Sequence, residues 1–388
     1  MSPSLCDFYT DNIYGYIADG LGYINSFVPF AVGEIVMYIG ALVFILAVIF
    51  LVLLIFLRRR QGYRRFCAVY YKTLLVALTA LVCIYMPTWY VPFCGTVLGR
   101  GTQEQKTVFS DKELYALYSY VVDGANAAAA EIHIAEDGSV DFLSPEEYRK
   151  KMESAMRNFS DEFPRLDGYY PPVKTALCSD ILDRMNIGGY TYPFTMEMTH
   201  TKYTDPVYLP LLDAHETAHH MGYYKESEAN LVSQITLSSS DDPFLRLAAF
   251  MDMYRYIEED YDMMISRIIT ELEESGQLRY PDASGAQTKE EKAERFWTML
   301  EMKSQALNEI LGEGHTLDER VYEIIDQANQ IEEEIYESDA HPIDDLPAVN
   351  DAIEETAVFG WSTQADILKE NNYDGVLLLL LQYFDGEL

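Results

Sequence analysis

The residues whose types and spacing suit chemistry lie between Leu211 and Asn230. This segment contains an HExxH motif made by His215, Glu216 and His219. On a helix the two histidines are one turn apart, so both imidazoles can reach one metal ion. Glu216 then flanks the open coordination position, where its carboxylate can take a proton from metal-bound water. The pattern predicts a zinc hydrolase, because Zn²⁺ lowers the pKa of that water towards neutrality.

A catalytic zinc site of this kind needs a third protein ligand. Gly222 can end the helix and turn the chain, and residues 228–237 are expected to form a second helix that packs back against the first. Glu228 would then complete a His₂Glu site around one zinc ion, with one position left for water. Glu226 is the alternative third ligand. His220 lies one position further round the helix and is expected to point away from the metal.

Other interpretations of the same residues stay open. The histidines could merely cap or pair on a helix, or zinc could serve a catalytically silent membrane protein that binds or senses a partner. A thiol hydrolase would use Cys178 with a histidine, but no nucleophile motif surrounds that cysteine. An intramembrane protease does not fit, because it would carry the motif in an apolar span and here Asp213 and Lys225 flank the motif.

Two apolar segments near the N-terminus predict transmembrane helices. Residues 35–57 carry no charge, and at about 1.5 Å per residue they span roughly 34 Å, enough to cross the hydrocarbon layer. Residues 68–86 form the second span, in which Lys72 can snorkel to the surface. A cleaved signal peptide is the first rival interpretation, and it requires a shorter apolar run with basic residues before it. Two buried core helices are the second rival.

The charges flanking these segments predict their orientation. The loop of residues 58–67 carries five arginines, whereas residues 1–34 contain no Lys or Arg. The positive-inside rule places that loop in the cytoplasm. The N-terminal segment 1–34 and everything from residue 95 to 388 are therefore expected outside the cytoplasmic membrane, as parts of a two-span protein bound to the lipid bilayer.

The outer part, residues 95–388, is strongly acidic. The whole chain of 388 residues holds 28 Lys and Arg against 62 Asp and Glu. Six of these basic and four of these acidic residues precede residue 95, so the outer part carries a formal charge of −36. Such a balance argues against nucleic acid as a partner, because phosphates need clustered cations. With five cysteines in the chain, one optional disulfide is the most we expect.

Local signals predict an α+β outer domain that is mostly helical. Capping boxes at Ser110, Thr288 and Thr316 each predict the start of a helix, and Ser144 followed by Pro145 at the first helical position predicts another. Residues 173–178 and 189–198 have the composition of short strands, and residues 376–381 are expected in a buried terminal helix. Residues 276–287 and 338–348 look like loops.

The sequence HETAHHMGYYKESEAN, residues 215–230, resembles the core of a bacterial family of two-span membrane proteins (domain of unknown function 3810). Further similar stretches are residues 29–34 before the first span, residues 192–197, residues 242–246 and the C-terminal residues 349–351 and 372–383. Residues 255–345 and the exit from the second span, residues 88–90, depart from the family pattern. The match covers most of the chain in patches, and the metal motif is its sharpest part.

The resemblance implies a fold and a site. It implies two N-terminal transmembrane helices followed by a zincin-like, gluzincin-type domain, with His215, His219 and Glu228 as zinc ligands and Glu216 as the catalytic base. The expected function is a membrane-anchored zinc metallopeptidase that hydrolyses a peptide or protein substrate at the outer face of the cytoplasmic membrane.

Some parts of such a site have no assigned residue. Thermolysin-type enzymes place an Asp four residues after the ligand Glu, and this chain has Val232 there. Asn230 or Asp213 are candidates for that supporting role. The candidates for stabilising the oxyanion are Tyr223, Tyr224 and His200. The strand around Phe194 and Thr195 could offer edge hydrogen bonds to an extended peptide.

Overall fold

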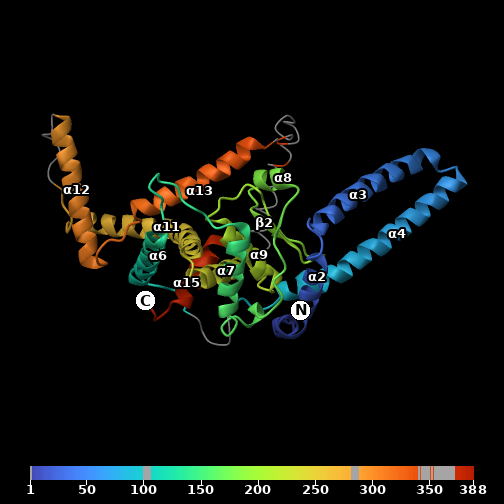
Figure 1. Ribbon diagram of the computed structural model, residues 1–388, viewed down its shortest axis with the longest axis horizontal. Coiled ribbons are helices and arrows are strands. Elements are labelled where there is room, and N and C mark those ends of the chain that lie inside the picture. The colour runs from blue at the N-terminus through green and yellow to red at the C-terminus, as the bar shows by residue number, and fades with distance from the viewer. Residues whose placement is uncertain are drawn as a thin grey trace.

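The computed structural model of the chain describes residues 2–98, 106–280, 288–339 and 372–388, with residues 341, 350 and 353. Most of it is helical (Figure 1). The elements before the sheet are α1 (Pro3–Tyr9), the π-helical η1 (Thr10–Tyr14), α2 (Gly15–Asn25), α3 (Val32–Leu57), α4 (Gln61–Tyr85), the π-helical η2 (Met86–Tyr90), α5 (Val91–Phe93), α6 (Asp111–Glu131), α7 (Pro145–Asn158) and η3 (Pro164–Leu166). They are followed by β1 (Lys174–Thr175), α8 (Ser179–Arg184), β2 (Gly189–Thr191), β3 (Met198–His200), α9 (Leu209–His220), α10 (Glu226–Ser238), α11 (Pro243–Glu274), α12 (Lys289–Ile310), α13 (Glu319–Ser338) and α15 (Asn372–Tyr383).

Helices α3 and α4 form a hairpin that projects from the rest of the molecule (Figure 1). Both are long and apolar enough to cross a membrane, and almost none of their residues are buried. This exposure excludes the alternative of two buried core helices. The turn between them is limited to residues 58–60, and the remainder of the predicted loop is the first part of α4. Hydroxyl groups join the two helices, because Tyr70 and Tyr71 donate to the backbone carbonyls of Val43 and Ala47 at 2.6 and 2.5 Å.

Hydrogen bonds to two carboxylates join the base of this hairpin to the rest of the molecule. Glu197, in the turn before β3, accepts hydrogen bonds from the backbone N–H groups of Val32 and Gly33 at 3.0 and 2.8 Å. These are free donors of the first turn of α3, so Glu197 caps that helix from another part of the chain. In return Glu34 accepts the N–H groups of residues 177 and 178 at 2.8 and 2.9 Å. Two of the stretches that resemble the family, residues 29–34 and 192–197, therefore meet here.

A buried ion pair supports the same junction. The ammonium of Lys174 lies 2.5 Å from Glu197 and also donates to the carbonyls of Asn25 and Phe30. Gly33 lies against the ring of Tyr192, where an added Cβ would come within 2.4 Å of the ring carbon Cγ. Glycine is therefore required at this approach, since any side chain would push the helix away from the domain.

The small sheet has the strand order β1-β3-β2. Strand β3 pairs in parallel with β1, with Lys174 opposite Thr199, and antiparallel with β2, with Tyr190 opposite Thr199. The strand predicted over residues 189–198 is thus two strands, β2 and β3, joined by a turn. Met196 takes a positive φ of 56° in that turn and its N–H bonds to the carbonyl of Tyr192 at 2.7 Å.

The main core lies among α6, α7, α9, α10 and α11. Helix α10 is buried along most of its length, and Val232 has no exposed surface. At the C-terminal end, α15 packs on α10 and buries Val376 and Leu380, which confirms the predicted terminal helix.

Three of the four predicted helix starts are confirmed. Ser110, Ser144 and Thr288 precede α6, α7 and α12, and each forms the reciprocal contact with the Glu three residues later. The fourth is wrong, because Asp318 rather than Thr316 precedes α13. All five cysteines are free thiols, so the optional disulfide is not formed. Most of the predicted loop at residues 338–348, residues 281–287 of the other predicted loop and most of the family-like stretch 349–351 lie outside the described residues.

Candidate metal centre

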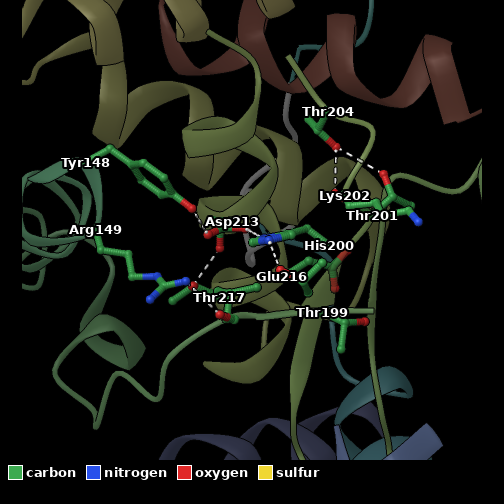
Figure 2. A network of polar contacts seen from close by, with 12 residues as sticks. Tyr148, Arg149, Thr199, His200, Thr201, Lys202, Thr204, Asp213, Glu216 and Thr217 are labelled. Atoms are coloured by element: carbon green, nitrogen blue, oxygen red, sulfur yellow. Dashed lines mark hydrogen bonds and ion pairs between the residues drawn. The ribbon is translucent and has the colours of Figure 1, made fainter. Parts of the chain in front are cut away.

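Asp213 fixes the helix that carries the HExxH motif. Its carboxylate lies 2.7 Å from Nδ1 of His200 on β3 and accepts a hydrogen bond from the hydroxyl of Tyr148 on α7 at 2.8 Å (Figure 2). Within the helix, Thr217 donates to the backbone carbonyl of Asp213 at 2.6 Å. Because Asp213 is fully buried, these contacts hold α9 between the sheet and α7. The metal motif therefore sits on a rigid element.

His215 and His219 converge with Glu226, the first residue of α10. Nε2 of His215 lies 3.2 Å from Oε2 of Glu226, and Nε2 of His219 lies 3.5 Å from the same oxygen. The three side chains offer donor atoms that all lie within 4.8 Å of one another. Ligands bonded to a tetrahedral zinc at about 2.0–2.1 Å are about 3.3 Å apart. This donor set therefore fits a zinc ion in its chemistry, and the two distances to Glu226 also match the spacing of zinc ligands.

A backbone contact prepares His219 to bind metal through Nε2. Nδ1 of His219 lies 2.8 Å from the carbonyl oxygen of Tyr223, which can only accept a hydrogen bond. In the neutral imidazole the proton therefore stays on Nδ1 and the lone pair is left on Nε2. Gly222 makes this contact possible, since its φ of +95° turns the chain directly after α9. Support of a ligand histidine was expected from Asn230 or Asp213, and a main-chain carbonyl provides it to His219 instead.

Glu216 lies on the side of α9 that faces strand β2. Its Oε2 accepts a hydrogen bond from the hydroxyl of Thr191 at 2.6 Å. Gly189 comes so close that an added Cβ would stand 2.9 Å from both Cγ and Oε1 of Glu216. Gly189 and Thr191 thus define the position of the Glu216 carboxylate, which is almost completely buried. Sequence reasoning missed both residues, because their contacts with Glu216 depend on how the sheet packs on α9.

The titration behaviour of the group reflects its close packing. Burial would raise the pKa of the Glu226 carboxyl, but the imidazoles of His219 and His215 hold that pKa well below its ordinary value. Burial opposes protonation of His219, yet Glu226 and then Glu216 raise its pKa to about 9. Burial raises the pKa of Glu216, and the two histidines oppose this shift. The raised pKa of His219 and the lowered pKa of Glu226 are those of an ion pair between the two side chains.

The structure does not bring Glu228, the predicted third ligand, to the histidines. One of its carboxylate oxygens accepts the N–H of Leu98 at 2.5 Å and the other accepts the N–H of Lys225 at 3.2 Å. Glu228 is the third residue of α10, where a Glu closes a capping box. Burial raises its pKa, and the two N–H groups oppose the shift. Of the two carboxylates considered, Glu226 is the one that lies beside the two histidines.

The other candidates have different partners. Asn230 donates to the hydroxyl of Tyr256 at 2.9 Å, so it does not support a ligand histidine. The hydroxyl of Tyr224 donates to that of Tyr14 at 2.7 Å, and His200 is bonded to Asp213. Tyr224 and His200 therefore have structural roles. Neither of them is assigned as the donor that would stabilise the oxyanion.

His220 points away, as expected, from the group formed by His215, His219 and Glu226, which is called the metal group below. Its Nδ1 lies 2.9 Å from the carbonyl of Met196, and its ring packs against Gly22 of α2. Burial lowers the pKa of His220 to about 4, so the ring is neutral at pH 7. The neighbouring His219 has an aromatic contact, because the ring centroid of Trp89 in η2 lies 6.2 Å from that of His219. The metal group is thus close to the junction with the projecting hairpin.

These features define a mostly helical protein with two apolar N-terminal helices and a His/Glu group on helices α9 and α10. The sequence profile described as "Protein of unknown function (DUF3810)" matches residues 9–309, and the chain belongs to this family. The matched region includes the helical hairpin and all four residues of the HExxH and Glu226 group. No curated protein and no solved structure matches the chain.

Proposed function

We propose that the protein is a membrane-anchored zinc metallopeptidase of gluzincin type, with a zincin-like domain at the outer face of the cytoplasmic membrane. The observation that carries the proposal is the convergence of His215, His219 and Glu226 beside the buried carboxylate of Glu216. Three nitrogen and oxygen donors with room for one more ligand are typical of catalytic rather than structural zinc.

In this proposal His215, His219 and Glu226 hold the ion. Zinc bound there supplies Lewis acidity, which lowers the pKa of water and polarises a carbonyl group. Glu216 takes the proton from the attacking water and passes it to the leaving amine. The hydroxyl of Thr191 keeps the Glu216 carboxylate in place, and the carbonyl of Tyr223 keeps His219 in the required tautomer.

The membrane part of the proposal rests on α3 and α4. Their turn carries Arg58, Arg59 and Arg60, and α4 adds Arg64 and Arg65 in its first turns. The positive-inside rule assigns this end to the cytoplasm. Both ends of the hairpin that join the domain then lie outside, together with the N-terminus and the metal group.

The test compares the full-length wild type in detergent with Glu216→Gln. Each protein is loaded with zinc, its metal content is measured, and it is incubated with a peptide library. We expect about one zinc ion per chain in both proteins and a loss of hydrolysis of about 10²-fold or more in Glu216→Gln. His219→Ala is the control that loses the metal.

Two results would overturn the proposal. Wild type that takes up no zinc at neutral pH would remove its basis, and so would hydrolysis that survives in Glu216→Gln. Zinc binding without cleavage of any peptide by wild type would favour the alternative, a catalytically silent zinc protein that binds or senses a partner.

A further inference from the structure

The N-terminal elements α1, η1 and α2 form one continuous helical segment whose buried residues recur at every fourth position. These are Cys6, Thr10, Tyr14, Ala18 and Gly22. On a regular α-helix of 3.6 residues per turn, residues spaced four apart shift gradually around the helix axis. The wider turns of η1 reduce this drift and keep the five residues on one face.

This buried face packs against the end of the metal-bearing helix α9. The hydroxyl of Tyr14 donates to the backbone carbonyl of His220 at 2.7 Å. Gly22 lies against the His220 ring, where an added Cβ would come within 3.0 Å of Cε1. The segment therefore belongs to the same packed body as the metal group, and its orientation is fixed.

The opposite face of the segment is apolar and exposed. The large side chains on it and on the short connection to α3 are Leu5, Phe8, Ile13, Tyr16, Tyr23, Ile24, Phe27 and Phe30. Tyr16 is 82% exposed and Phe27 is 73% exposed. Soluble monomers rarely leave so many neighbouring large apolar side chains in water.

The charges of the segment all turn towards the protein. Asp7 accepts the N–H of Thr96 at 2.8 Å, and Asp19 accepts the N–H of Tyr169 at 3.0 Å. Asp11 pairs with Arg165 at 2.8 Å. No other Asp, Glu, Lys or Arg occurs in residues 1–33. The Asp11 side chain is 53% exposed, but it is paired, so residues 2–33 leave no unpaired charged side chain on the exposed face.

We propose that this face lies in the outer interfacial layer of the bilayer that α3 and α4 cross. The exposed face is continuous with the hairpin, because Phe27 and Phe30 directly precede α3 and the segment packs beside the junction with α4 (Figure 1). Helices with one apolar face settle at the boundary of headgroups and acyl chains, and tyrosine rings are favoured at that depth. The face has no basic residues, so apolar burial rather than attraction to anionic lipid would hold it.

This inference rests on the proposed membrane anchoring and deepens the proposed function. The same segment that would lie on the bilayer contacts His220, next to the ligand His219. The metal group is then held at the membrane surface. Its substrate class becomes polypeptide segments that lie at or emerge from that surface, rather than proteins free in solution.

The test places new tryptophans on the face and measures their contact with lipid. Full-length protein is reconstituted in phosphatidylcholine vesicles with or without brominated acyl chains, which quench tryptophan on contact. The variants are Tyr16→Trp and Tyr23→Trp, and the matched control is Tyr322→Trp on α13, since Tyr23 and Tyr322 are 57% and 53% exposed. Phe44→Trp, in the middle of α3, reports insertion.

We expect brominated lipid to remove about half or more of the emission added at positions 16 and 23, and to leave that at position 322 unchanged. Quenching of Phe44→Trp without quenching at 16 and 23 would overturn the inference while the anchoring stands. Shielding of 16 and 23 from aqueous acrylamide without lipid quenching would also overturn it, in favour of a second protein copy on this face. Failure of Phe44→Trp to be quenched would overturn the anchoring and the inference together. None of these measurements depends on zinc or turnover. Failure of the peptidase proposal can therefore be distinguished from failure of this inference.

Discussion

The choice between two carboxylates two residues apart is the sharpest prediction for the metal group. Glu226 and Glu228 are about 200° apart around α10, so they cannot both face the histidines. Glu226 lies 3.2 Å from His215, whereas Glu228 accepts backbone N–H groups on the other side of the helix. In the proposed zinc site, Glu226→Gln therefore removes a ligand, whereas Glu228→Gln removes only part of a helix cap.

The two substitutions should differ widely in their effect on zinc affinity. Structural zinc sites with four ligands bind with about 10–16 kcal/mol, or about 2.5–4 kcal/mol per ligand. Loss of the Glu226 carboxylate should therefore weaken zinc binding by about 10²–10³-fold. Gln is also accepted at the third position of a capping box, so Glu228→Gln should destabilise the fold by about 1 kcal/mol and leave zinc affinity nearly unchanged.

The measurement is competition for zinc between the full-length protein in detergent and a chromophoric chelator, at one fixed pH and ionic strength for all variants. The pH must be fixed because zinc has to displace the proton of His219, whose pKa is raised to about 9. Circular dichroism of each variant shows whether it is folded. The reasoning is refuted if Glu228→Gln loses zinc while Glu226→Gln keeps it. That outcome would mean that the first turn of α10 rotates when metal binds.

The junction between the hairpin and the domain gives two further predictions. Glu197→Gln leaves the buried ammonium of Lys174 without its counter-ion, and we expect about 3 kcal/mol less stability against chemical denaturation in micelles; the exposed control Glu146→Gln should stay within about 0.5 kcal/mol of wild type. A loss below about 1 kcal/mol for Glu197→Gln would mean that the remaining carbonyl acceptors satisfy Lys174. Gly33→Leu must displace the ring of Tyr192, so its melting temperature should fall by several degrees in the same micelles, and an unchanged value would show that the contact is not tight.

Helix starts and the histidine pair could be predicted from the sequence because their causes are local. The capping boxes at Ser110, Ser144 and Thr288 act within three residues, and the spacing of His215 and His219 is one turn of any helix. The terminal helix around Val376 was also predictable, since an apolar run too short to span a bilayer must be buried.

The third ligand could not be chosen from the sequence because it depends on the geometry of a turn. Gly222, with a φ of +95°, helps to set the direction in which α10 leaves α9, and that direction decides which acid faces the histidines. The contact of Thr191 with Glu216 and the capping of α3 by Glu197 are likewise invisible locally. Both join residues that are far apart along the chain, and only packing brings them together.

The bond between Tyr14 and His220 constrains the order of events during synthesis. Its partners are 206 residues apart, so the N-terminal helix has no docking site until more than half of the chain has been made. At about 5–20 residues per second, that interval lasts roughly 10–40 s. In the proposed topology the N-terminal segment crosses the membrane and then passes this time without its final partner. Completion of α9 is therefore also the step at which the beginning of the chain reaches its final position.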